Sequence, residues 1–185
     1  MQVMRLMTAV RRIDRRLTKR MAARHEGSVR QTLSAVEEAA EGSKLWLGAA
    51  AVMMGAGGWQ RRTSAAAGLT ALALAQVISN AVCKQMVDRL RPPKEWIPHD
   101  EVEDRPDSSS FPSGHTAAAV AFTAAVFPSW PSAGAACAVP AALVAVERVQ
   151  SGAHYPSDVA AGAAVGLVSA WLTRRLPRLA LRAWR

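Results

Sequence analysis

The sequence predicts an all-α protein: a polytopic membrane helical bundle with about five transmembrane helices and an N-terminal amphipathic helix on the membrane surface. Three observations lead to this fold class. Long alanine-rich runs carry almost no charge, the charged residues are concentrated outside those runs, and prolines or arginines mark the short connections. Because a helix needs about 20 residues to cross a bilayer, such runs favour membrane crossings. A soluble helical bundle with an alanine-rich core is the alternative.

The charge distribution divides the chain into three parts. It has 185 residues, with 23 Lys and Arg against 14 Asp and Glu, a formal net charge of +9. We expect basic helices on the membrane surface at 1–44, the transmembrane core at 45–173 and a basic tail at 174–185. Such an excess of basic over acidic residues indicates a nucleic acid, an anionic membrane surface or a phosphorylated substrate as partner. Residues 1–44 contain no aromatic side chain for base stacking, so we expect no nucleic acid.

The beginning of the chain has the pattern of an amphipathic basic helix. Apolar residues recur at steps of three and four, and arginines and lysines occupy the remaining faces. This pattern is typical of a helix in the lipid headgroup region; an RNA-binding arm and a helix packed on the bundle are the alternatives. A second, weaker helix is expected at 28–41. The apolar positions are Val3, Leu6, Met7, Val10, Ile13, Leu17 and Met21.

Five apolar runs follow, and each is expected to be one membrane crossing. Tryptophans lie near the run ends, where an aromatic belt at the membrane surface places them. In the last run, Gly162 and Gly166 have the spacing that lets two helices approach closely in a bilayer, which permits a homo-oligomer without requiring one. The runs cover 45–59, 63–83, 116–130, 131–146 and 155–172, and the tryptophans are Trp46, Trp59, Trp130 and Trp171.

Polar residues gather at the ends of three apolar runs, and the expected threading brings them to one side of the membrane. "KQMVDRLRP" ends the second run, with Lys84 and Arg91 seven residues apart. That step is close to two helical turns, so both cations are expected on one face of a helix. "PSGH" (112–115) begins the third run, where Gly114 lets backbone amides approach an anion at a helix N-terminus. The polar stretch 91–111 joins these clusters, and loops of this length are usually functional or disordered.

The third cluster, "RVQSGAHYPSD", supplies Arg148, His154 and Asp158. An aspartate four residues after a histidine is able to accept its ring N–H, which fixes the tautomer and makes the other nitrogen the better nucleophile. The other histidine, His115, is able to donate a proton to a leaving group. With the fixed cations, these groups suffice for phosphoryl transfer by positioning and charge stabilisation. We therefore expect no cofactor and no metal ion.

The three clusters together resemble a known family. Lys-x6-Arg-Pro, then Pro-Ser-Gly-His, then Arg-x5-His-x3-Asp is similar to the pattern of the type 2 phosphatidic acid phosphatase superfamily, over roughly residues 45–173. The resemblance implies that His154 attacks phosphorus and becomes a phosphohistidine, and that Asp158 orients His154. His115 would protonate the departing alkoxide and then activate water. The phosphate oxygens would be held by Lys84, Arg91, Ser113, the Gly114 amide and Arg148.

The resemblance also implies a multi-pass protein of the cell membrane, whose partners are membrane lipids and a lipid phosphate substrate. Phosphatidic acid, phosphatidylglycerophosphate and polyprenyl diphosphate are the expected substrate classes. The Ala- and Arg-rich composition and "EGSKLW" before the first run are also similar to decaprenylphosphoryl-5-phosphoribose phosphatases of cell-wall arabinan precursor synthesis. A non-catalytic protein that only binds lipid phosphate is the alternative of another class.

One position departs from the family pattern. The residue before Arg148 is usually serine in the family, and here it is Glu147. A carboxylate at this position is able to neutralise part of the phosphate site, to pair with Lys94, or to contact a substrate headgroup. We expect this departure to affect the choice of substrate more than the class of reaction.

Overall fold

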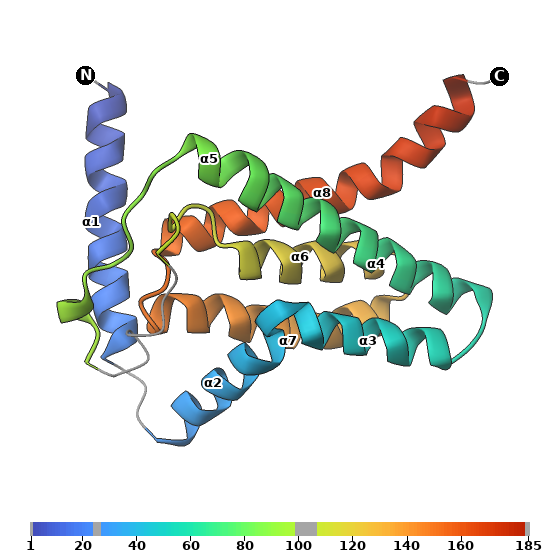
Figure 1. Cartoon of the computed structure of the whole chain (residues 1–185), viewed down its shortest axis with the longest axis horizontal. Helices are drawn as coiled ribbons and strands as arrows, with labels where there is room; N and C mark the ends of the chain where they lie inside the picture. The colour runs from blue at the N-terminus through green and yellow to red at the C-terminus, as the bar shows by residue number, and fades with distance from the viewer. Residues whose placement is uncertain (1, 24–26, 99–106, 184–185) are drawn as a thin grey trace.

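The computed structural model describes residues 2–23, 27–98 and 107–183, and it shows a bundle of helices with one helix across its end (Figure 1). No strand occurs in these ranges, as the sequence predicted. The elements are α1 (Gln2–Ala22), α2 (Ser28–Ala40), η1 (Glu41–Ser43), α3 (Lys44–Gly55), α4 (Trp59–Val77), η2 (Ile78–Cys83), α5 (Lys84–Met86), η3 (Lys94–Trp96), α6 (Gly114–Val126), α7 (Pro131–Gln150) and α8 (Pro156–Ala183).

The five apolar runs all form helices, but they differ in length. In the described part of the chain, two helical stretches are long and apolar enough to cross a membrane: Trp59–Met86, which joins α4, η2 and α5, and Pro131–Gln150, which is α7. The 13 residues of α6 extend about 20 Å at 1.5 Å per residue, against a hydrocarbon core about 30 Å thick. The number of membrane crossings therefore stays a prediction.

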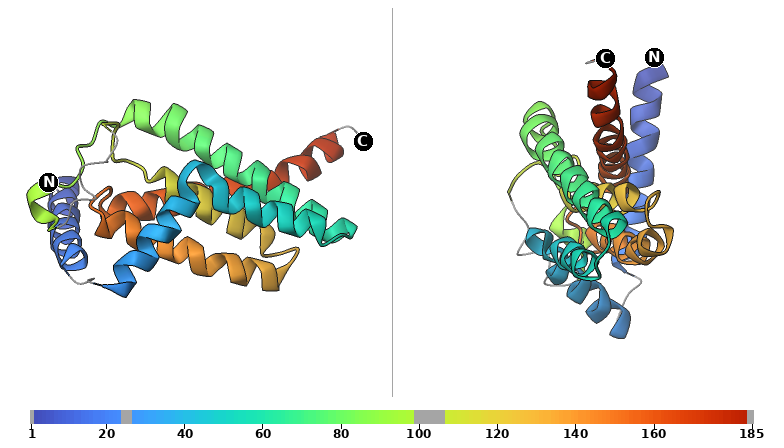
Figure 2. Two further views of the ribbon diagram at one scale, coloured as in Figure 1. Left: turned by 60° about the horizontal axis from the view of Figure 1, so that its bottom comes forward. Right: turned by 90° about the vertical axis from the view of Figure 1, so that its right-hand side faces the viewer.

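Helix α6 lies at the centre of the bundle, packed against α4, α7 and α8 (Figure 2). Its alanines are almost fully buried, and small side chains of this kind let the neighbouring backbones come close. Larger residues fill the space toward α3, where the rings of Trp46 and Phe122 lie with centroids 5.5 Å apart. This packing fixes the N-terminus of α6, which lies at the same end of the bundle as α1.

The two glycines of the last run, Gly162 and Gly166, allow α8 to pack closely against α6 within the same chain. A Cβ atom on Gly166 would lie 2.6 Å from the carbonyl oxygen of Ala117, and one on Gly162 would clash with the carbonyl oxygen of Ser113. Both glycines therefore face α6. Their close approach places the first turns of α6 and α8 side by side, where the Ser113 amide donates to the Asp158 carbonyl at 3.1 Å.

Helix α1 lies across the end of the bundle and contacts α7, α8 and η3. Its inward side carries two buried polar residues, Asp14 (2% exposed) and Thr18 (0% exposed). The outward side presents a row of exposed apolar side chains, and the placement of this row in a headgroup region stays a prediction. The exposed apolar residues are Met4, Leu6, Met7, Val10, Ile13 and Leu17.

Candidate active site

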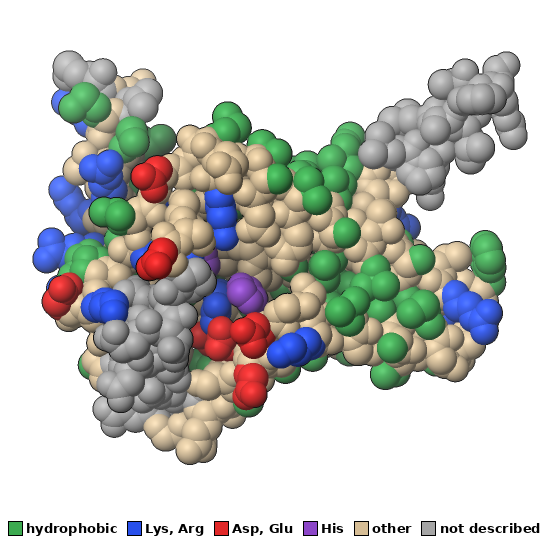
Figure 3. Space-filling model, viewed as in Figure 1, with side chains coloured by type: hydrophobic (Ala, Val, Ile, Leu, Met, Phe, Trp, Pro, Cys, Tyr) green, Lys and Arg blue, Asp and Glu red, His purple; other side chains and the backbone are tan. Residues whose placement is uncertain are grey.

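Five of the eight predicted site residues line a pocket at the end of the bundle where α6 begins, and Ser113, Arg148 and Asp158 are not among the lining residues. The cavity measures about 200 Å³, and five residues named from the sequence line it. Figure 3 shows a histidine at this hollow, with Lys or Arg and Asp or Glu side chains around it. The five residues are Lys84, Arg91, Gly114, His115 and His154.

One wall of the pocket comes from the turn between α2 and α3. Ala40, Gly42 and Ser43 line the cavity from this side. The turn is tight because Gly42 and Ser43 both have positive φ angles, 57° and 64°, a conformation that is uncommon for a residue with a side chain such as serine. The turn thus places α2, which the family motifs do not include, beside the residues predicted to bind phosphate.

His154 lies in the short connection between α7 and α8 and is 4% exposed. Its Nδ1 atom is 2.6 Å from the carbonyl oxygen of Ser110. Because a carbonyl oxygen only accepts, Nδ1 carries the proton and donates it, which leaves the lone pair of a neutral ring on Nε2. Burial lowers the pKa of His154 well below its ordinary value, and the positive charge of Arg91 lowers this pKa further. The ring is therefore neutral at physiological pH.

The structure corrects the predicted role of Asp158. We expected its carboxylate to accept the ring N–H of His154, but the carbonyl of Ser110 accepts that proton. The carboxylate of Asp158 instead accepts from the guanidinium of Arg89 and, at 2.9 Å, from the backbone amide of Tyr155. His154 precedes the first turn of α8, so the four-residue step that joins side chains on a helix does not apply here.

The two cations of the first motif reach the pocket from different elements, which corrects a second expectation. Lys84 begins α5, after the π-helical stretch η2, and this helix ends at Met86. Arg91 lies beyond it in extended chain and is followed by two prolines; a residue before proline disfavours the helical conformation. Its Nη1 atom donates to the carbonyl of Ala153 at 2.6 Å, which fixes the guanidinium next to His154.

Ser113 and His115 begin α6 in the way that the second motif predicted. The Ser113 side chain caps the helix, because its Oγ atom accepts from the Thr116 amide at 3.5 Å and lies 3.0 Å from Thr116 Oγ1. Ser113 is fully buried behind the pocket wall, whereas Gly114 and His115 line the pocket. The positive end of the helix dipole and the first amides of α6 therefore lie at the cavity.

Arg148 is held by two carboxylates, one of which the sequence did not indicate. Its Nε atom forms a short ion pair with Glu147, and its Nη2 atom lies 2.5 Å from Glu37 of α2. The structure thus pairs Glu147 with Arg148 and not with Lys94. Glu37 gave no sequence signal, because nothing in the sequence of α2, SVRQTLSAVEEAA, shows that Glu37 contacts a residue more than 100 positions away.

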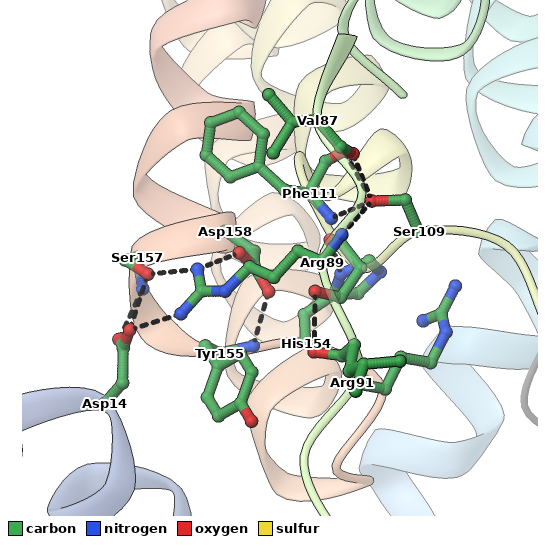
Figure 4. A network of polar contacts seen from close by, with 12 residues as sticks. Asp14, Val87, Arg89, Arg91, Ser109, Phe111, His154, Tyr155, Ser157 and Asp158 are labelled. Carbon is green, nitrogen blue, oxygen red and sulfur yellow. Dashed lines mark hydrogen bonds and ion pairs between the residues drawn. The ribbon is translucent and has the colours of Figure 1, made fainter. Parts of the chain in front are cut away.

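Four further residues of the site were missed by sequence reasoning. Asp14 and Arg89 join α1 to Asp158 in a network of polar contacts (Figure 4). Asn80 and Gln76 both line the pocket, and the side-chain amide of Asn80 donates to the side-chain oxygen of Gln76 at 2.9 Å. Asp14 did offer a signal, as the single acidic residue among the first 25. Within the described ranges, no group of three or more His, Cys, Asp or Glu side chains is arranged to hold a metal ion.

Comparison with known proteins begins with the sequence. A family model described as the PAP2 superfamily matches residues 64–182, more than half of the chain. Lipid A 1-phosphatases of Rhizobium johnstonii and Rhizobium etli are 48% identical over 67 residues and 50% identical over 60 residues, which is 35% and 31% of this chain. These alignments cover 25% of the length of each relative.

Two solved structures are similar across most of the chain. The PAP2-type phosphatidylglycerolphosphate phosphatase of Bacillus subtilis has a TM-score of 0.70 at 20% identity, covering 92% of this chain and 87% of that one. Aquifex aeolicus LpxE has a TM-score of 0.69 at 22% identity, covering 86% and 93%. At these identities the similarity concerns the fold, which with the two long apolar helices indicates a membrane protein. The three motifs and the family match together show that this chain belongs to the PAP2 superfamily, the type 2 phosphatidic acid phosphatases.

Proposed function

We propose that the protein is an integral-membrane, metal-independent phosphatase that hydrolyses a lipid phosphate monoester or diphosphate through a phosphohistidine intermediate. The observation that carries the proposal is the state of His154. Its Nδ1–H is bound to the Ser110 carbonyl, its ring is neutral, and it borders a pocket shared with His115 and two cations. A neutral imidazole with a free Nε2 lone pair is a competent nucleophile toward phosphorus.

The reaction would proceed in two balanced steps. In the first, Nε2 of His154 attacks phosphorus, the bond from phosphorus to the leaving oxygen breaks, and His115 gives that oxygen its proton. In the second, His115 takes a proton from water as the water oxygen attacks the phosphohistidine. The products are inorganic phosphate and the starting form of His154. Lys84 and Arg91 and the first amides of α6 would stabilise the charge on the phosphoryl oxygens in both steps.

The substrate class is proposed from the family and from the relatives. The relatives are named for activity on lipid A and on phosphatidylglycerolphosphate. For this chain we propose phosphatidic acid, phosphatidylglycerophosphate or polyprenyl diphosphate in the cell membrane. All three present a terminal phosphate at the membrane surface, and a pocket at one end of a membrane bundle is suited to such a group.

A decaprenylphosphoryl-5-phosphoribose phosphatase is the second candidate, and one feature of the pocket favours it. Gln76 near the end of α4 and Asn80 in η2 are polar residues that line the cavity. One donor and one acceptor of these amides bond to each other at 2.9 Å. Their remaining donors and acceptors are suited to the hydroxyl groups of a sugar. A diacylglycerol leaving group presents no such hydroxyls next to its phosphate.

The test is phosphate release by the purified protein in detergent and EDTA, over a panel of these four lipid phosphates. We expect release from at least one lipid, loss of release in His154→Ala, and acid-labile labelling of the wild type by a substrate carrying ³²P. His25→Ala, which changes a histidine outside the three motifs, is the matched control and keeps its activity. Binding of lipid phosphate without release on any lipid would support the non-catalytic alternative and overturn the proposal.

A further inference from the structure

Asp14 is a buried acid on a strongly basic helix. It is 2% exposed and is the only acidic residue within α1. Burying an ionised carboxylate is costly unless charged and hydrogen-bonding partners compensate for the lost water. The position of Asp14 is therefore determined by its partners, which all come from the catalytic end of the bundle.

The first partner of Asp14 is the N-terminus of α8, the helix that follows His154. Asp14 Oδ1 accepts from the Ser157 amide at 3.0 Å, and Oδ2 accepts from the Ser157 hydroxyl at 2.7 Å. Amides in the first turn of a helix have no partner within the helix, and an acid placed there is stabilised by the helix dipole. Asp14 thus caps α8 from another helix.

The second partner is Arg89, which connects Asp14 to the residues around His154. Its Nη2 atom lies 2.7 Å from Asp14 Oδ2, and its Nη1 atom pairs with Asp158. The guanidinium carbon lies 4.3 Å from the ring centroid of Tyr155, the residue after His154. Figure 4 shows Arg89 between the two carboxylates, with Ser157 and Tyr155 on either side.

The backbone of Arg89 extends this connection to the histidine itself. The carbonyl of Arg89 accepts from the Ser110 amide at 2.9 Å, and the carbonyl of Ser110 accepts from His154 Nδ1 at 2.6 Å. Arg89 therefore contacts both structures that hold the ring, the turn before α8 and the Ser110 peptide. The guanidinium of Arg89 is in turn held by the carboxylates of Asp14 and Asp158.

We propose that Asp14 is a positioning residue of the active site, which acts through Arg89 and Ser157 on the turn and the peptide that orient His154. The proposal rests on the proposed function of His154 as nucleophile. Helix α1 is thereby part of the machinery that places the reacting nitrogen, in addition to any contact that it makes with lipid. A residue that only attaches α1 to the bundle would affect stability and leave the reaction of the folded protein unchanged.

The experiment compares Asp14→Asn with Thr18→Val on the same helix. Thr18 is fully buried, and its hydroxyl has no hydrogen-bond partner within the described residues, so the control alters α1 packing without touching Arg89. We expect Asp14→Asn to lower kcat by about 10- to 100-fold with KM within about threefold, because small displacements of reacting groups have effects of this size. Thr18→Val keeps its kcat, and Asp14→Glu recovers part of the loss.

Two further measurements separate positioning from folding and from the proposed function. In the double variant with Arg89→Gln, the Asp14→Asn change should cost no further activity, because both act along one chain of contacts. The Nδ1 proton of His154, followed by NMR in isotope-labelled protein, should shift in Asp14→Asn and not in Thr18→Val. This readout needs no turnover, so it tests the proposal even if the wild type releases no phosphate.

Three outcomes of these measurements would overturn the proposal. An unchanged kcat and an unchanged Nδ1 resonance in folded Asp14→Asn would show that the residue only anchors α1. Equal losses in Asp14→Asn and Thr18→Val, in proportion to the folded fraction, would show the same. Additive losses in the double variant would show that Asp14 and Arg89 act on the reaction separately.

Discussion

The ion pair between Glu37 and Arg148 leads to a specific prediction about substrate affinity. Arg148 is one of the proposed phosphate-binding cations, yet its Nη2 atom is 2.5 Å from Glu37 and its Nε atom is paired with Glu147. A phosphate that binds Arg148 through Nη2 must displace the carboxylate of Glu37. We therefore predict that Glu37→Gln binds phosphate more tightly than the wild type.

The size of the effect follows from the exposure of the pair. The side chain of Glu37 is 37% exposed and that of Arg148 is 8% exposed. Ion pairs between exposed groups contribute about 0.2–1 kcal/mol, and a pair with one buried partner belongs at the upper end of that range. Since 1.4 kcal/mol is a factor of ten in an equilibrium constant, about 1 kcal/mol is roughly fivefold. We expect KM for a lipid phosphate and Ki for inorganic phosphate to fall about three- to fivefold.

The assay measures phosphate release and its inhibition by inorganic phosphate, at two salt concentrations. Glu38→Gln is the matched control, because it makes the same change at the neighbouring exposed position, and it should leave both constants unchanged. The advantage of Glu37→Gln should shrink at high salt, because salt screens the half-exposed pair that it removes. A raised KM in Glu37→Gln would refute the reasoning, since it would mean that Glu37 orients Arg148 for the substrate. An unchanged KM and Ki would show that the contact does not compete with phosphate.

Three other changes test the packing, the nucleophile and the unusual glutamate. Gly166→Val should destabilise the protein by about 1–3 kcal/mol, as overpacked sites do, and lower Tm by several degrees; Gly48→Val, where an added Cβ has open space, should not. The His154 imidazole, titrated by NMR, should take up its proton well below pH 6.5, and Arg91→Gln should raise this pKa because it removes a neighbouring positive charge. Activity should then be lost as the pH falls through the folded-state value, and stability should decline below about pH 6.5, where the unfolded chain binds a proton that the buried ring does not. Glu147→Ser should keep kcat/KM within about tenfold, roughly 1.4 kcal/mol, because Glu147 contacts only Nε of Arg148 and the change leaves the Nη1 and Nη2 atoms of the guanidinium in place.

The sequence predicted the features of this site that depend on local pattern. The runs at 63–83 and 131–146 became α4 with its extension and α7, because apolar composition and length act along one stretch of chain. "PSGH" predicted a helix N-terminus, and Ser113 does cap α6, since capping involves residues three positions apart. Pocket residues that are far apart in sequence were brought together by the expected threading of the apolar runs and by the resemblance to a family.

Both errors concern contacts expected from spacing along the sequence, at places where the chain is not a continuous helix. Lys84 and Arg91 were placed on one helix face, but the helix ends at Met86 before the two prolines. Asp158, four residues after His154, was expected to accept its ring N–H, but His154 lies before α8 begins and its Nδ1 atom contacts the Ser110 carbonyl. In both cases a turn or a proline breaks the register, and the contact goes to another segment.

The contacts that sequence reasoning missed join segments brought together only by the folded bundle. Asp14 and Glu37 contact Arg89 and Arg148, yet each acid belongs to a helix before the matched range of 64–182. That range contains the proposed nucleophile, the proposed acid and the cations of the motifs. In our proposals the two N-terminal acids act on these groups, Asp14 on the position of His154 and Glu37 on the charge at Arg148. We therefore propose that phosphate affinity and the geometry of His154 depend in part on α1 and α2, which precede the range matched by the family model.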